Sequence, residues 1–332
     1  MTDQWRRAGA IRAPNWVDTA RLFALGAIWG SAFLSIEIGL ESMGPFTLTA
    51  SRLVLSAGLL LGLMALARLP FPRQGWVWRR LALVSLFNAA LPFALISWGQ
   101  QSVDSAMAAV LMGAGPLIGL ILNHLFTGDD RMSAAKVLGV SLGFVGVLLL
   151  FGEEAWAALQ AGWRGGLNIA SVQALGGAGG VWAGVLGQLA IVGGAASYAL
   201  SGLLTRRLSH LDTRVAAASM LLLSTLYFLP LAFWAEGLKV GNLTGRAIVA
   251  VLFLGLVASG FAALMRFQLI KDTGAVFMSQ VSYLVPVFGV AFSALFFLRA
   301  PQPQTLAALL LILCGVAVSR IRKKSQIFPP GG

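Results

Sequence analysis

Ten long apolar stretches divide this chain, and they constrain its fold more than any other feature of the sequence. A bilayer core of about 30 Å is crossed by about 20 consecutive apolar residues in a helix, and the stretches approach that length. The composition agrees, because 58% of the residues are hydrophobic and 11% are charged, against roughly 25% charged residues in soluble domains. We therefore predict an all-α polytopic membrane protein with ten transmembrane helices, at 20–40, 45–67, 80–99, 104–125, 134–151, 182–204, 214–235, 246–267, 273–297 and 303–319.

Basic residues are distributed unevenly between the two sides of these helices. If the N-terminus is cytoplasmic, 18 Lys and Arg residues fall in or beside cytoplasmic segments and 4 fall on the other side. Such a positive-inside bias predicts cytoplasmic termini in a multi-pass protein of the cell (inner) membrane. The net charge of +12 is then a topology signal, so we expect membrane lipid as a partner and no nucleic acid.

An internal repeat divides the spans into two sets of five. A proline, a glycine and a phenylalanine recur 170 positions apart in the fourth and ninth spans: Pro116 and Pro286, Gly119 and Gly289, Phe126 and Phe296. An odd number of spans per repeat inverts the second copy relative to the first, as in carriers with alternating access. The predicted organisation is a cytoplasmic N-terminal segment (1–19), a first five-helix repeat (20–151), an extracytoplasmic connection (152–181), a second five-helix repeat (182–319) and a basic cytoplasmic tail (320–332).

The paired prolines suggest where these helices bend. Proline lacks the N–H that closes an i to i−4 hydrogen bond, so Pro116 leaves the carbonyl of Met112 free and Pro286 leaves that of Ser282 free. Within a membrane, such groups need protein or a water-filled cavity around them. We predict hinges around a central cavity, although prolines that serve packing alone are the alternative. The candidate hinge residues are Pro92, Pro116, Gly119, Pro286 and Gly289.

These features together resemble one transporter family. The inverted five-helix repeats, the WG pair at 29–30, Arg52 early in the second span and the proline-centred fourth and ninth spans are similar to EamA-type transporters of the drug/metabolite transporter superfamily. The resemblance covers residues 20–320 and is greatest to ten-span amino-acid exporters of the YddG kind. It implies export of small organic metabolites, above all amino acids. Many EamA-type repeats carry a glutamate after the fourth and ninth spans, where this chain has Asp129 and Asp130 in one copy and Arg299 in the other.

Helical spacing indicates which side chains line a central cavity. Residues three, four or seven positions apart share a helix face, and polar or aromatic residues recur at such steps in several spans. Aromatic faces suit apolar or aromatic solutes, whereas small polar residues also mark close helix packing. The predicted substrate-binding residues are Trp29, Phe33, Asn88, Met112, Tyr198, Ser279, Gln280 and Tyr283.

Formal charges within the spans are rare. Glu37 and Arg52 both fall in the outer halves of their spans, so they are predicted to form a gating ion pair, with binding of a substrate carboxylate by Arg52 as the alternative. Arg266 is near the cytoplasmic end of its span and is expected to extend toward the interface. Because no acidic residue is near the predicted midplane, we expect facilitated diffusion, and a proton-coupled drug/metabolite antiporter is the alternative.

Other classes of function have little support in the sequence. His124 and His210 are the only histidines, and neither belongs to a metal-binding or hydrolase motif. No glycine-rich phosphate loop is present. We therefore expect no enzymatic activity, catalytic residue, metal or cofactor, and a small-molecule substrate. A non-transporting membrane scaffold or lipid-binding protein is the alternative, and the sequence leaves the oligomeric state open.

Overall fold

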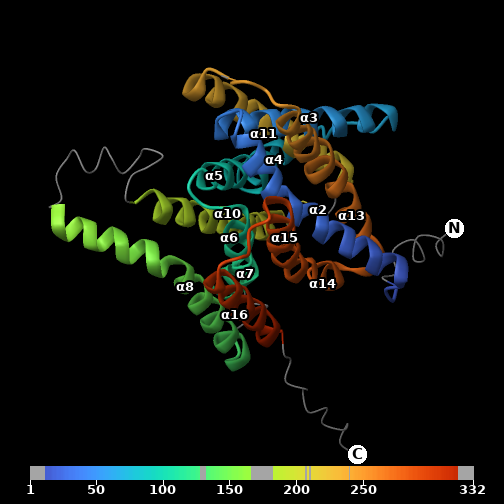
Figure 1. The fold of residues 1–332 in the computed structure, drawn as a ribbon. Coiled ribbons are helices and arrows are strands. Elements are labelled where there is room, and N and C mark those ends of the chain that lie inside the picture. Colours follow the sequence, from blue (N-terminus) through green and yellow to red (C-terminus); the bar gives the residue numbers. More distant parts are fainter. Residues whose placement is uncertain are drawn as a thin grey trace, which may run out of the picture.

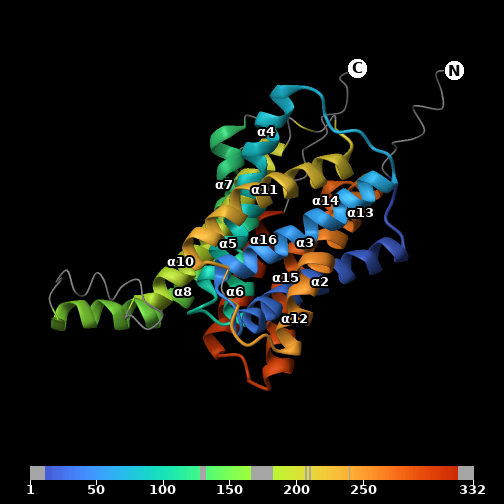
Figure 2. The same ribbon diagram turned by 90° about the horizontal axis from the view of Figure 1, so that it is seen from above.

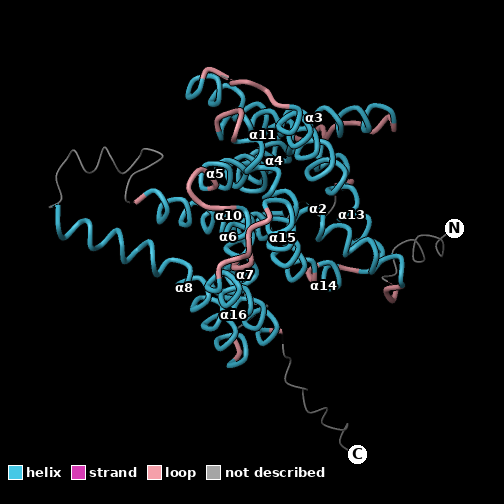
Figure 3. Tube along the Cα trace, in the orientation of Figure 1, coloured by secondary structure: helices cyan, strands magenta, loops and turns pink. Residues whose placement is uncertain are grey.

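The computed structural model describes residues 12–127, 132–165, 182–205, 208, 211–238 and 240–320. Every element in these ranges is helical (Figures 1 and 3). The elements are α2 (Trp16–Leu40), α3 (Pro45–Leu66), α4 (Gly75–Ser85), η1 (Leu86–Ala90), α5 (Leu91–Gly99), α6 (Ser105–Met112), α7 (Gly115–Phe126), α8 (Ala134–Gly165), α10 (Ala183–Thr205), α11 (Thr213–Glu236), α12 (Gly245–Leu252), η3 (Phe253–Phe261), α13 (Ala262–Thr273), α14 (Ala275–Met278), α15 (Val281–Phe297) and α16 (Pro303–Ser319).

These elements make up ten apolar membrane-spanning segments. Within the described ranges nine helices, some of them built from joined elements, are long and apolar enough to cross a membrane, and the shorter apolar α16 is the tenth. The third span is α4–η1–α5, the fourth α6–α7, the eighth α12–η3–α13 and the ninth α14–α15. Figure 2 shows α4 and α7 toward one end of the bundle, and α12 and the α15–α16 connection toward the other.

The packing of the helices follows the inverted repeat. The second and seventh spans pack together as α3 and α11, and the fifth and tenth pack together as α8 and α16. The first span, α2, packs against α15 of the ninth, while the sixth, α10, packs against α6 and α7 of the fourth. If the two repeats are exchanged, the pairing of the first span with the ninth becomes the pairing of the sixth span with the fourth. The fold is therefore two inverted five-helix repeats around a pseudo-twofold axis.

Glycines allow the central helices to approach closely. A Cβ on Gly30 would lie 2.6 Å from the Cβ of Phe288, and one on Gly289 would lie 2.3 Å from the Cβ of Ala109. These contacts bring α2, α6 and α15 together at the centre of the bundle. Small residues at such crossings are the usual basis of helix packing in membranes, where apolar burial gives no driving force between helices.

Two spans contain π-helical segments at corresponding positions of the repeats. In the third span η1 directly precedes Pro92, whose missing N–H disrupts the regular hydrogen-bond ladder. In the eighth span η3 contains Gly255 and Gly260, and added Cβ atoms there would meet Leu55 and Leu59 of α3. Wide turns of this kind occur often at functional sites.

The two proline-centred spans differ in shape. The fourth is interrupted at Gly113 and Ala114, and Pro116 is in the first turn of the new helix α7. The ninth is interrupted earlier relative to its proline, at Ser279 and Gln280, so that Pro286 lies inside the continuous helix α15. The paired prolines therefore do not mark equivalent breaks.

The predicted boundaries hold within a few residues for most spans. The main difference is α8, which continues to Gly165 and extends away from the bundle (Figure 1). The segment after residue 152 is rich in Ala, Leu, Glu and Gln, which favour helix even where the apolar pattern stops. Residues 1–11, most of the predicted connection (166–181), Asp129, Asp130 and the tail from 321 onward lie outside the described residues.

Candidate functional site

Trp29 joins the first span to the π-helical part of the eighth. Its indole Nε1 donates a hydrogen bond of 3.1 Å to the carbonyl oxygen of Ala258 in η3. The side chain is half-buried and packs at the edge of a cluster that includes Leu25 and Val281. Trp29 is therefore fixed in orientation while part of its ring remains accessible.

Asn88 and Tyr198 lie where the third and sixth spans meet. The Oδ1 atom of Asn88, in η1, accepts a hydrogen bond of 3.0 Å from the hydroxyl of Ser201 on α10. One turn away, Tyr198 packs edge-on against Phe93, with 6.5 Å between ring centroids. Both Asn88 and Tyr198 are half-buried, so each keeps part of its surface accessible.

The predicted residues of the ninth span cluster around its break. Gln280 is exposed within the break itself, and the hydroxyl of Ser279 donates to the carbonyl of Val276. Arg320, at the end of α16, donates a 3.0 Å hydrogen bond to the Ser279 carbonyl. Its guanidinium also lies over the ring of Tyr283, 4.7 Å from the centroid. These side chains form a group at the same end of the bundle as α14.

Phe33 and Met112 belong to the main apolar core. Phe33 is 7% exposed and packs in the cluster that contains Ala109 and Val290, while half-buried Met112 packs against the same cluster. The backbone carbonyl of Phe33 accepts a 2.9 Å hydrogen bond from Nε2 of Gln100. In this structure Phe33 thus supports the helix crossing and has little accessible surface.

Glu37 and Arg52 have separate partners, so the predicted ion pair is not formed here. The Glu37 carboxylate accepts a 2.8 Å hydrogen bond from the backbone N–H of Ser105, at the N-terminus of α6. A helix N-terminus presents unpaired N–H groups and a partial positive charge, which suit a carboxylate. Arg52 instead faces the eighth span, where its Nε donates to the hydroxyl of Ser259 at 2.7 Å.

The environment of Arg52 includes two residues that sequence reasoning missed. Its guanidinium carbon is 3.7 Å from the centroid of the Phe93 ring, a cation–π distance, and Ser259 supplies the hydrogen bond. A charged residue within a span requires partners, and that requirement is the only signal in the sequence. Serines and phenylalanines occur in most of the spans, so the sequence does not identify which of them contact Arg52.

Two polar networks connect the repeats at opposite ends of the bundle. At one end the Glu236 carboxylate, on α11, accepts hydrogen bonds from the backbone N–H groups of Phe46 and Thr47 at 3.0 and 2.7 Å. Nearby, the hydroxyls of Ser105 and Ser293 are 2.9 Å apart, joining α6 to α15.

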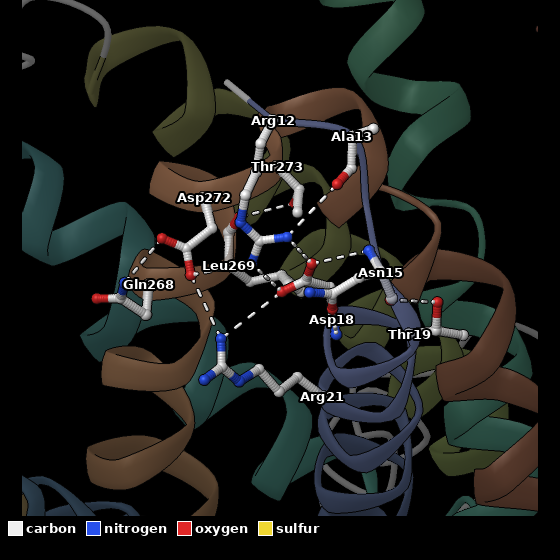
Figure 4. Close-up of polar contacts among 10 residues, drawn as sticks. All are labelled: Arg12, Ala13, Asn15, Asp18, Thr19, Arg21, Gln268, Leu269, Asp272 and Thr273. Atoms are coloured by element: carbon white, nitrogen blue, oxygen red, sulfur yellow. Dashed lines mark hydrogen bonds and ion pairs between the residues drawn. The ribbon is translucent and has the colours of Figure 1, made fainter. Parts of the chain in front are cut away.

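The network at the other end surrounds the start of α2 (Figure 4). Arg12 pairs with Asp18, and Arg21 lies 3.3 Å from the carboxylate of Asp272 at the end of α13. The hydrogen bond that Arg12 donates to the Asp18 carboxylate raises the pKa of Arg12, so Arg12 stays charged throughout the physiological range. The backbone N–H of Arg12 also donates to the Asp272 carbonyl at 3.1 Å. The first and eighth spans are thereby joined at this end.

The two halves of the fourth span are packed differently. All residues of α6 from Ser105 to Leu111 are buried, and α6 contacts both α2 and α15. In α7 only Leu117 is buried. The main contacts of helix α7 are with α8, α10 and α16. The bundle is therefore closely packed around α6 and looser around α7. By the positive-inside prediction, α7 is in the cytoplasmic half.

The described residues contain no group of three or more His, Cys, Asp or Glu side chains arranged as metal ligands. What the site offers instead is a set of aromatic, amide and guanidinium groups on helices from both repeats. Such groups bind and orient a solute through hydrogen bonds, charge and ring contacts.

Comparison with known proteins gives consistent matches over nearly the whole chain. The model of the EamA-like transporter family matches residues 20–152 and 185–321. The Bacillus subtilis (strain 168) protein named uncharacterized transporter YoaV is 23% identical over 296 residues, covering 89% of this chain and 94% of that protein. The inner membrane transporter YedA of Escherichia coli (strain K12), also named as uncharacterized, is 26% identical over 271 residues, covering 81% and 79%.

A further relative and a solved structure extend these matches. Protein PagO of Salmonella typhimurium (strain LT2) is 22% identical over 314 residues, covering 94% of this chain and 95% of PagO. A crystal structure of a protein 20% identical in sequence has a TM-score of 0.62, and the match covers 92% of this chain and 97% of the other. This last similarity concerns the fold alone.

Proposed function

This chain belongs to the EamA-like transporter family, and from that premise we propose that it exports small organic metabolites by alternating access around the accessible region between its repeats. It is a multi-pass membrane transporter, and the inner membrane is its location because the relative YedA is named an inner membrane transporter. Amino acids, including apolar and aromatic ones, are the first solute class that we propose. A carboxylate would approach Arg52, and an apolar side chain would contact rings such as Trp29 and Tyr198.

The observation that carries the proposal is the unequal packing of the fourth span. Alternating access requires that the two sides of a central site open in turn. Close packing of α6 against α2 and α15, beside loose packing around α7, supports a state that is closed on the outer side and accessible from the cytoplasm. An exporter loads its solute in such a state.

We further propose that transport is facilitated diffusion. Glu37 is the acidic residue deepest within the predicted spans, and its carboxylate is engaged by the N–H of Ser105. A proton-coupled carrier needs a titratable group that faces each side of the membrane in turn, whereas Glu37 is held at the N-terminus of α6. This supports a mechanism in which the solute moves down its own gradient, rather than proton-coupled antiport.

An export screen tests the transport function directly. Cells that overexpress the protein should enrich particular metabolites in their medium, as measured by metabolomics, relative to cells that express no extra copy. Purified protein in liposomes should then exchange the enriched solute faster than empty liposomes. If liposomes with the protein exchange no solute from the screen, the chain is a scaffold or lipid-binding protein, and the proposed function is wrong.

Alanine variants test the site within the same assay. We expect Trp29→Ala, Asn88→Ala, Gln280→Ala and Tyr283→Ala each to raise the apparent KM or to abolish binding, because each removes an aromatic or amide group that is accessible to solute. Phe23→Ala, which removes an exposed ring on α2, is a matched control and should leave the KM unchanged. Normal solute binding in all four variants would mean that the solute binds elsewhere.

A further inference from the structure

Two arginines within the membrane-spanning bundle, Arg52 and Arg266, form no ion pair with any acidic side chain of the described residues. Arg52 is 7% exposed, and the hydrogen bond from Nε to Ser259 is its only one to the described residues. Its terminal amino groups have no partner there. These nitrogens are not among the fully buried, unpaired polar atoms of the described residues, so they have access to solvent. A guanidinium that keeps accessible, unused donors inside a membrane-spanning bundle fits a ligand that is present for part of the transport cycle.

Arg266 presents a second free charge to the same region. It has neither a hydrogen bond nor an ion pair in the described part of the chain. On α13 it is five residues after Phe261 and two before Gln268, both exposed, so it is on roughly the opposite side of the helix from them. The Arg266 side chain is exposed, while Leu264 and Phe267 on the same helix pack against the cluster that contains Phe93. Helix α13 therefore brings the charge of Arg266 close to the cluster that Tyr198 also contacts.

Tyr198 lies in the same region as both arginines. It packs edge-on against Phe93, the ring that Arg52 covers, and it contacts the same cluster as Phe267, the neighbour of Arg266 on α13. Among the described residues no carboxylate forms an ion pair with either guanidinium. We call Arg52, Tyr198 and Arg266 the cationic centre. Tyr198 contributes a phenol hydroxyl, which can donate a hydrogen bond to an anion without adding charge.

We infer that the cationic centre selects small organic anions, and that solutes with a net negative charge are transported in preference to zwitterions and cations of the same shape. This inference rests on the proposed transport function, and within the small organic metabolites it shifts the preferred class from neutral amino acids to organic anions. Guanidinium groups bind carboxylates with paired, charge-assisted hydrogen bonds. The ammonium group of a zwitterion would be placed near two positive charges with no carboxylate to receive it, which costs affinity.

Two series of solutes with matched skeletons test the charge preference. One consists of succinate, 4-aminobutanoate and 1,4-diaminobutane, and the other of 3-phenylpropanoate, phenylalanine and 2-phenylethylamine. Each series contains an anion, a zwitterion and a cation at neutral pH. Binding is measured as the shift in melting temperature of the purified protein, and transport as exchange in liposomes. We expect the anion of at least one series to bind and cross with a half-saturating concentration about tenfold lower than its zwitterion, or better.

Variants separate the cationic centre from general surface charge. Arg266→Gln should raise the half-saturating concentration of the anion about tenfold or more, and Arg266→Lys should restore part of the loss because it keeps the charge. Arg299→Gln removes one positive charge from the exposed connection between α15 and α16 and should have no such effect. Because Arg266 makes no hydrogen bond, its replacement should not prevent folding. Arg52→Gln removes the charge of Arg52, whereas Ser259→Ala removes only its hydrogen-bond partner. Comparing the two variants separates loss of the charge from loss of that hydrogen bond.

The outcomes distinguish this inference from the proposed function. Equal or better binding of a zwitterion or cation, or an Arg266→Gln protein with an unchanged preference for anions, would overturn the inference. A failure of both anions to bind would overturn it as well. In each case exchange of any solute from the export screen would leave the transport function standing, whereas absence of all solute exchange would remove that function too.

Discussion

At the scale of single residues, Glu236 joins the two repeats. Its carboxylate accepts hydrogen bonds from the backbone N–H groups of Phe46 and Thr47 and from the Thr47 hydroxyl. These N–H groups belong to the first turn of α3 and have no partner within that helix. One side chain at the end of the seventh span thereby caps the second span.

Glu236→Gln should therefore lower the stability of the protein. The amide nitrogen of glutamine would face N–H donors, and the loss of bonds to a charged group costs about 1–3 kcal/mol. We expect a lower melting temperature of the purified protein in detergent. Glu41→Gln, at an exposed position beside the end of α2, is the matched control and should melt like the parent. Equal melting temperatures of all three proteins would mean that the cap does not contribute to stability.

At the scale of elements, hydropathy and proline chemistry predict most of what the structure contains. The ten spans follow from apolar length, and η1 before Pro92 follows from a missing donor. Other features depend on contacts that one sequence does not reveal. The π-helix η3 contains no proline, so the proline rule does not predict it. Its glycines are required because α3 packs closely against them, and the sequence does not reveal that contact. The break at Ser279 and Gln280 precedes Pro286 by more than a turn, so the proline rule misplaced it.

The prolines of the fourth and ninth spans should affect transport more than folding. Pro286→Ala supplies an N–H that can close a hydrogen bond within α15, and Pro116→Ala removes the ring that opposes the joining of α6 and α7 into one helix. Each change should stiffen its span without destabilising it. We expect slower solute exchange in liposomes and a melting temperature equal to or above that of the parent. Pro303→Ala, in the first turn of α16, controls for loss of a proline at a helix start. Parental exchange rates in both variants would contradict a hinge role.

At the scale of the whole molecule, charge is distributed in a way that the sequence predicted only in part. The positive-inside pattern and the small number of charges within the spans were readable from the residues. The pairing of Glu37 with Arg52 was not correctly predicted, because distance along the sequence does not reveal that α2 directs Glu37 to α6 while α3 directs Arg52 to η3. The grouping of Arg52 and Arg266 around Tyr198 depends on the packing of the eighth span against the second, which the sequence does not reveal.

The scarcity of acidic groups within the bundle leads to a prediction for energy coupling. Purified protein in liposomes should exchange its solute at the same rate with and without an imposed pH gradient, and should not accumulate it. Glu37→Gln should behave like the parent in this comparison, since Glu37 is engaged by Ser105. Uphill accumulation that a protonophore abolishes would show that transport is coupled to protons.

The unequal shapes of the fourth and ninth spans have a consequence for the whole transport cycle. One span is broken beside its proline, while the other carries its proline within an unbroken helix. The repeats are related by an axis in the plane of the membrane, so a molecule in which they traded shapes would be the same object viewed from the opposite side of the bilayer. We therefore expect the opposite state of the transport cycle to have a fourth span that continues through Pro116 and a ninth span that is broken beside Pro286.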